Sequence, residues 1–286
     1  MTTFDTKLLL PPEEGASLPL YRPVWRAVGY EMALLVAGAL VIYFGASLLN
    51  IQVGAARRPL MTALLAIAPL GLWLLFSWRG ERRVQHPRQG LLTVLVISAL
   101  VATAVAAPFI EQVVEPDRWL NALPGITRIL GHMVTVGLTV EFLKYLVLRY
   151  VCWPKWFERR IDCVAYSMAV SLAFATVFNL RFALLEGGAQ PGAAAIRVVS
   201  VVLAQQGIGL VVSYRLMTLK FGQAGMFSLA TGLLIGSFLH GVYTAFRAGF
   251  VVGGFGIGAT ANVPLMGLGF SAAFAAGLFA VFSFLI

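Results

Sequence analysis

Eight long apolar stretches limit what this chain can fold into. They lie at residues 29–50, 60–78, 90–110, 126–150, 162–185, 194–219, 223–247 and 262–286. Each is long enough to cross the roughly 30 Å hydrocarbon core of a bilayer as a helix. We therefore predict an all-α fold, a polytopic transmembrane helical bundle of about eight helices. The last two boundaries are the least defined, because residues 250–261 are Gly-rich and uncharged.

Composition excludes a water-soluble globule. Hydrophobic residues make up 59% of the chain and charged residues 12%, which is about half the usual charged share of soluble domains. The net charge of +9 would suit a nucleic-acid ligand, but the basic residues concentrate in short loops between apolar stretches. That distribution is typical of orientation signals in membrane proteins. The lipid bilayer is thus a predicted partner, and nucleic acid is not.

The loop charges predict the orientation. The basic loops lie between the second and third stretches, between the fourth and fifth, and after the sixth. Their basic residues are Arg79, Arg82, Arg83, Arg88, Lys155, Arg159, Arg160, Arg215 and Lys220. The alternating loops carry Glu111, Glu115 and Asp117, against Arg57, Arg58 and Arg118. Because basic loops stay in the cytoplasm, we expect both termini to be cytoplasmic.

The first 28 residues are polar and lack the basic start and early apolar core of a secretory signal. We expect residues 1–28 to form a cytoplasmic amino-terminal arm. Residues 29–286 then form the transmembrane domain.

Two opposite charges, Glu141 and Lys144, lie inside the fourth apolar stretch. Charged groups at bilayer depth are costly, so they face the protein interior, pair with other groups and often mark a functional site. Three residues apart on a helix, the two side chains share a face. They are either a catalytic pair or an intrahelical ion pair that holds the bundle together.

The seventh stretch carries a stripe of small and polar residues at four-residue spacing: Gly232, Gly236, His240 and Thr244. Small residues let a neighbouring helix approach closely. Gly137, one turn before Glu141, has the same property. In the fifth stretch, Arg181 is expected to snorkel to the membrane surface or to pair with Glu186.

No Walker loop, dinucleotide fingerprint or nucleophile elbow occurs in a suitable context. Cys152 and Cys163 match no compact metal motif. We therefore predict no cofactor.

Several motifs follow one another through about residues 137–250. They are Glu141-x-x-Lys144, Phe157-Glu158-x-x-x-Asp162-x-x-x-Tyr166, Ala173-Phe174-Ala175-x-x-x-Asn179-x-x-Phe182, Arg197, Ser213-Tyr214 and Phe238-x-His240-Gly241-x-Tyr243. Their order, spacing and topology resemble the PrsW family of intramembrane proteases, related to membrane-embedded prenyl-protein endopeptidases. The resemblance implies a PrsW-like core at about 126–250, a location in the bacterial inner (plasma) membrane, and catalytic roles for Glu141, Lys144, Asn179 and His240.

The sequence departs from the family pattern at several positions. Where the family has the first of two adjacent glutamates, a glutamate before the asparagine, and a histidine, this chain has Val140, Phe178 and Gln205. The polar residue four after the last histidine falls on Thr244.

These departures bear on metal binding. A hydrolytic zinc site normally uses three protein ligands, and Glu141 with His240 supplies two. His132 precedes Glu141 by nine residues, so on a regular helix it points to roughly the opposite face. No metal site is predicted.

Two function classes follow. In the interpretation we favour, the chain is a degenerate PrsW-like pseudoprotease that binds another integral membrane protein or acts as an accessory subunit of a membrane complex. The alternative is an active glutamic- or metal-type intramembrane endopeptidase. A transporter is the weakest hypothesis, because no internal repeat is visible.

The resemblance also makes a geometric prediction. The fourth to seventh helices should surround one polar pocket, with Glu141 within hydrogen-bond reach of Asn179, Gln205 or His240. Gly137 and Gly236 should permit the close approach of the helices. Phe178 should partly fill the space of the missing glutamate.

Overall fold

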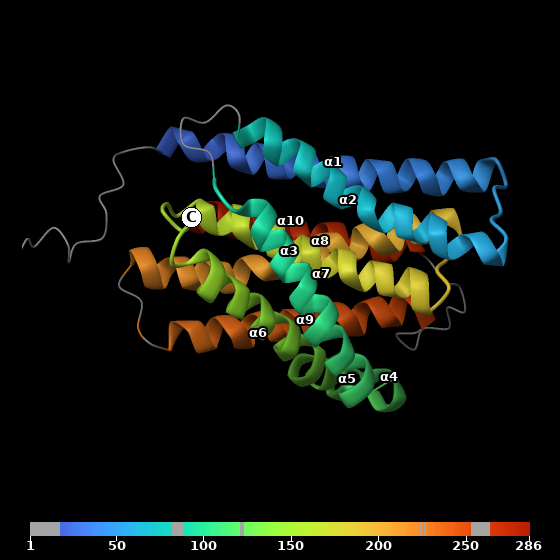
Figure 1. Ribbon diagram of the computed structural model, residues 1–286. Coiled ribbons are helices and arrows are strands. Elements are labelled where there is room, and N and C mark those ends of the chain that lie inside the picture. The colour runs from blue at the N-terminus through green and yellow to red at the C-terminus, as the bar shows by residue number, and fades with distance from the viewer. Residues whose placement is uncertain (1–17, 82–87, 121–122, 223–224, 226, 253–263) are drawn as a thin grey trace, which may run out of the picture.

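The computed structural model describes the chain except for residues 1–17, 82–87, 121–122, 223–224, 226 and 253–263. Within the described residues every regular element is helical. Eight helical segments are long and apolar enough to cross a membrane, and they form one bundle (Figure 1). The predicted all-α polytopic fold is confirmed.

The observed helices follow the predicted stretches closely. In chain order they are α1 (Leu18–Leu48), η2 (Ala55–Arg57), α2 (Arg58–Glu81), α3 (Leu91–Val101), η3 (Ala102–Ala106), η4 (Phe109–Val114), α4 (Pro116–Trp119), α5 (Gly125–His132), η6 (Met133–Gly137), α6 (Leu138–Val147), η7 (Leu148–Cys152), α7 (Asp162–Leu185), α8 (Pro191–Phe221), α9 (Ser228–Val252) and α10 (Pro264–Leu285). Helix α1 begins inside the arm expected at residues 1–28. Most of the Gly-rich stretch at 250–261 lies outside the described residues.

Two of the membrane-spanning segments are not regular α-helices. The third contains the π-helical segments η3 and η4, and the fourth contains η6 and η7. Wider π-helical turns occur often at functional sites. Segment η6 lies between His132 and Glu141, so the regular-helix assumption behind the predicted orientation of His132 does not hold there.

Helix α8 is the core of the bundle. In its membrane-spanning window 94% of the residues are buried, against 67% for α7 and 17% for α1. Helix α8 has buried residues on all sides, which is typical of a helix at the centre of a bundle. A Cβ at Gly192 would lie 3.0 Å from Tyr43 of α1, and one at Gly207 would lie 3.2 Å from Leu278 of α10. The glycines of α8 thus let several helices pack directly against it.

Both described ends of the chain and the α6–α7 connection lie at one end of the bundle (Figure 1). Arg88, Lys155 and Arg159, from two of the predicted cytoplasmic loops, line one pocket there. The Lys220 ammonium donates hydrogen bonds to the carbonyl oxygens of Trp153 and Phe157, which brings the end of α8 to the same place. The described parts of these basic loops therefore lie at one end of the bundle, and their predicted location in the cytoplasm remains a prediction.

Arg181 pairs with a different carboxylate from the one expected. Its Nε donates to Glu111 Oε1 at 2.7 Å, and its second guanidinium contact is with Glu111 Oε2. Helix α7 packs against α3 and η3, so its end meets η4. The pairing with Glu186 was wrong because the partner is set by packing between helices.

Candidate functional site

Glu141 and Lys144 form a completely buried ion pair on α6. The Lys144 Nζ donates to Glu141 Oε1 at 2.8 Å, and the side chains are 0% and 1% exposed. The Lys144 ammonium also donates to the main-chain carbonyl of Gln205 on α8, at 3.4 Å. The one-turn spacing of the two residues places both groups on the same helix face. The charge of the carboxylate is therefore balanced within its own helix.

His240 of α9 joins this pair from the side. Its Nδ1 lies 3.4 Å from Glu141 Oε1, the same oxygen that accepts from Lys144. The other carboxylate oxygen, Oε2, is buried and has no hydrogen-bond partner in the structure. The predicted contact between Glu141 and at least one of the three candidate residues is thus confirmed.

Glycines make this approach of α9 possible. A Cβ at Gly137 would lie 2.5 Å from the Ser237 carbonyl oxygen and 3.2 Å from the His240 Cβ. A Cβ at Gly236 would lie 3.4 Å from the Glu141 Cγ. Gly137 therefore permits a backbone contact that no larger residue would allow, and Gly236 leaves room beside the carboxylate.

Gln205 and Asn179 take different positions from His240. Gln205 offers its main-chain carbonyl to Lys144, while its side-chain oxygen is buried without a hydrogen-bond partner. Asn179 is buried on α7, and its Nδ2 donates to the Val198 carbonyl of α8 at 3.4 Å. Three helices, α6, α8 and α9, therefore meet at Glu141, and the recorded hydrogen bond of Asn179 holds α7 to α8.

Val140 and Phe178 stand where the resemblance implies glutamates. Val140 is fully buried and belongs to the hydrophobic core. Phe178 packs edge to face on Phe174, one turn earlier on α7, with ring centroids 6.3 Å apart. Both positions take part in apolar packing.

Other motif residues connect neighbouring helices. Ser213 Oγ donates to the Cys163 carbonyl at 2.7 Å, from α8 to α7. Tyr243 donates to the Ser200 carbonyl at 2.9 Å, from α9 to α8. The guanidinium of Arg197 lies 3.6 Å from the centroid of the Phe182 ring. These contacts hold α7 and α9 to α8.

A second buried carboxylate, Glu31 on α1, was missed in the sequence. It is 4% exposed and lies beside Gln206 of α8, the residue next to Gln205. Glu31 could have been found by the criterion that identified Glu141, because both are acidic residues within an apolar stretch. Glu31 therefore places α1 beside the residue that follows Gln205 on α8.

One comparison with known proteins gives a match. A family model described as PrsW family intramembrane metalloprotease matches residues 86–269. This region contains Glu141, Lys144, Asn179 and His240. No curated protein and no solved structure matches the chain.

Proposed function

This chain belongs to the PrsW family of intramembrane metalloproteases, and we propose that it is a pseudoprotease that binds another integral membrane protein, as a partner or as an accessory subunit of a complex. The observation that carries the proposal is the state of Glu141. Its carboxylate is fully buried and ion-paired with Lys144 at 2.8 Å. A carboxylate that is buried and ion-paired in this way is poorly placed to activate water.

The family description implies a metal, but the residues around Glu141 do not fit one. In the described part of the chain, no group of three or more His, Cys, Asp or Glu side chains converges. Glu141 and His240 are two ligands, and a hydrolytic zinc ion normally takes three from the protein. Lys144 also brings an ammonium group to Glu141 Oε1, where its charge would repel a cation.

Catalysis without a metal would need a base with access to water and donors for an oxyanion. Glu141 Oε1 already accepts from Lys144 and contacts His240. Asn179 uses its amide to bind Val198. Glu141 Oε1 and the Asn179 amide nitrogen are therefore already engaged in contacts within the bundle.

One observation favours the alternative, a metal-independent endopeptidase. Glu141 Oε2 has no hydrogen-bond partner and lies against Gly236, where a Cβ would be 3.7 Å away. A small displacement of α9 would open space for water beside that oxygen. His240 would then be close enough to donate to a developing oxyanion.

Purification in mild detergent tests both functions. The wild type is compared with Glu141→Leu/Lys144→Leu, which removes the buried pair, and with Glu111→Leu/Arg181→Leu, which removes an ion pair at the bundle end. We expect no cleavage of a synthetic transmembrane peptide by any of them, and a stoichiometric membrane-protein partner with the wild type and the control. Cleavage by the wild type that the first variant lacks would overturn the pseudoprotease proposal. A wild type that purifies alone would overturn the role as a partner.

As part of the same proposal, the protein lies in the bacterial inner membrane with both termini in the cytoplasm. The support for this orientation is the gathering of Arg88, Lys155 and Arg159 at one end of the bundle.

A further inference from the structure

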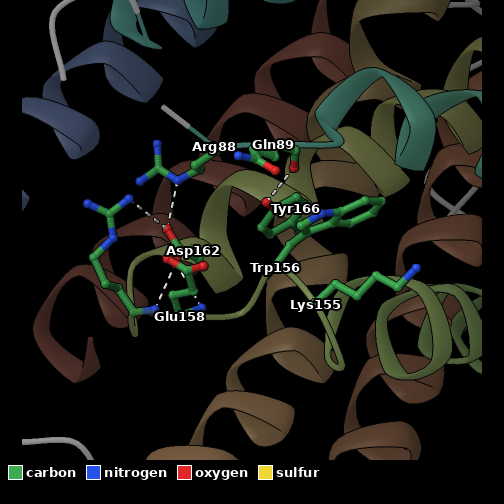
Figure 2. Close-up of a pocket in the computed structure, with 8 residues that line it drawn as sticks. Arg88, Gln89, Lys155, Trp156, Glu158, Asp162 and Tyr166 are labelled. Carbon is green, nitrogen blue, oxygen red and sulfur yellow. Dashed lines mark hydrogen bonds and ion pairs between the residues drawn. The ribbon is translucent and has the colours of Figure 1, made fainter. Parts of the chain in front are cut away.

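A pocket of about 420 Å³ lies at the basic end of the bundle, away from Glu141. It is formed by the residues just before α3, the connection between η7 and α7, and the first turn of α7 (Figure 2). Three cationic and two acidic side chains line it: Arg88, Lys155, Arg159, Glu158 and Asp162. None of these residues belongs to the site around Glu141.

Aromatic packing fixes the wall of the pocket. Trp156 stacks on Tyr166 with ring centroids 6.2 Å apart, and Tyr166 donates to the Gln89 carbonyl at 2.8 Å. Gly90 has a φ of 74°, and a Cβ there would overlap the Trp156 ring. The wall thus depends on position 90, where only glycine fits without strain.

The acidic residue at the centre of the pocket is already satisfied. Asp162 accepts from Arg88 Nε at 2.8 Å and from the main-chain N–H groups of Glu158 and Arg159, at 3.2 and 2.8 Å. Arg159 also lies 3.6 Å from the same carboxylate. Asp162 therefore serves to hold two guanidinium groups side by side, and its charge is neutralised by them.

Two cationic side chains, Arg159 and Lys155, have N–H donors that can bind a ligand. The guanidinium group of Arg159 lies 3.6 Å from the Asp162 carboxylate, beyond hydrogen-bond distance, and its side chain is 40% exposed. Within the described part of the chain, no ion pair or hydrogen bond is recorded for the exposed ammonium of Lys155. In Figure 2, Lys155 extends on the far side of Trp156 from Asp162. The pocket thus offers positive charge on both sides of an aromatic wall.

The depth of the pocket indicates the source of its ligand. The neighbouring membrane-spanning segments begin at Leu91 and Asp162 and end at Cys152, so the basic residues lie at the level of the lipid headgroups. Trp and Tyr side chains favour this level, and basic pockets between transmembrane helices bind anionic headgroups.

We propose that this pocket binds a phosphate group, that of an anionic phospholipid headgroup, at Arg159, and that Lys155 attracts the headgroup electrostatically from the other side of Trp156. Guanidinium and ammonium groups are the usual protein ligands of phosphate. The inference is independent of the proposed function, because it concerns residues that do not contact Glu141 or His240.

Lipid titration followed by native mass spectrometry of the full chain tests this site. We expect the wild type to bind phosphatidylglycerol more tightly than phosphatidylcholine. Each cation near a headgroup contributes about fivefold in affinity, so Lys155→Gln/Arg159→Gln should weaken binding about 30-fold. The control, Arg57→Gln/Arg118→Gln, removes the same charge at the other end of the bundle and should leave binding unchanged.

Lys155→Gln alone is the control for misfolding, since within the described residues no hydrogen bond or ion pair of that side chain is recorded that the change would break. It should weaken phosphatidylglycerol binding about fivefold. Equal binding of this lipid by the wild type and both pocket variants would overturn the proposal, as would equal affinity of the wild type for the two lipids.

A second arm identifies the source of the phosphate. Ligands that bind the folded state raise the Tm. If the ligand is a headgroup, phosphatidylglycerol should raise the Tm of the wild type, and inorganic phosphate should not. An increase with inorganic phosphate that Lys155→Gln/Arg159→Gln abolishes would keep the phosphate site and assign it to a free phosphate. No increase with either ligand would overturn the site.

Discussion

Gly137 and Ser237 bring the fourth and seventh membrane-spanning segments into backbone contact. A Cβ at Gly137 would lie 2.5 Å from the Ser237 carbonyl oxygen and 3.1 Å from its Cα. Main-chain atoms within a helix cannot move aside as a flexible side chain can. This contact therefore sets the distance between η6 and α9, and with it the 3.4 Å approach of His240 of α9 to Glu141 of the adjoining α6.

Replacing Gly137 tests that relationship. We expect Gly137→Ala to destabilise the bundle by about 1–3 kcal/mol, the usual cost of overpacking a tight contact. Gly71→Ala is the matched control, because a Cβ there meets nothing within 4 Å. Thermal unfolding in detergent measures both. Equal Tm values for the two variants would show that α9 adjusts freely.

The buried pair makes a second prediction. Lys144→Met leaves Glu141 as an uncompensated buried charge and should cost about 3–5 kcal/mol. The double variant Glu141→Leu/Lys144→Met removes both charges and should recover most of that loss, since apolar replacements of buried pairs are often neutral. Equilibrium unfolding of the wild type, each single variant and the double variant measures the coupling. Additive losses would contradict a structural role for the pair.

The sequence was sufficient for the fold because hydropathy over a spanning length decides where a transmembrane helix forms. The fifth stretch, 162–185, coincides with the observed span Asp162–Leu185. The contact of Glu141 with His240 could also be predicted, because a buried charge needs partners and Gly137 indicated a close helix approach. The functional roles of these residues remain a prediction.

Other features depend on packing between distant segments and had no local signal. Arg181 pairs with Glu111 on another helix although Glu186 is closer in sequence. The amide of Asn179 binds a carbonyl of α8 because α7 packs along that helix. Segment η6 alters the helix phase between His132 and Glu141, and hydropathy does not register such a change. Glu31 was missed although an acidic residue within an apolar stretch is a visible signal.

The orientation of the bundle is a third prediction. Reporter fusions at Arg83 and Arg159 should read cytoplasmic, and a fusion at Asp117 should read external, because basic loops are retained in the cytoplasm. Arg88 and Arg159 line the same pocket, so the first two fusions should agree. An external reading at Arg159 would reverse the topology.

The last prediction concerns Gly90, which supports the pocket wall. Its φ of 74° disfavours any residue with a side chain, and a Cβ would also overlap the Trp156 indole. Gly90→Ala should therefore lower stability through both backbone strain and the clash, by more than the ~1 kcal/mol typical of strain alone. Gly125→Ala at the start of α5 is the control, since a Cβ there meets nothing within 4 Å.

A double-mutant cycle with Trp156→Ala separates the two causes. In that background the clash is absent, so the cost of Gly90→Ala should fall to about 1 kcal/mol from strain. Tm measurements on the four proteins give the coupling. An unchanged cost in the Trp156→Ala background would show that the ring does not rest on Gly90, and the pocket wall would then need another support.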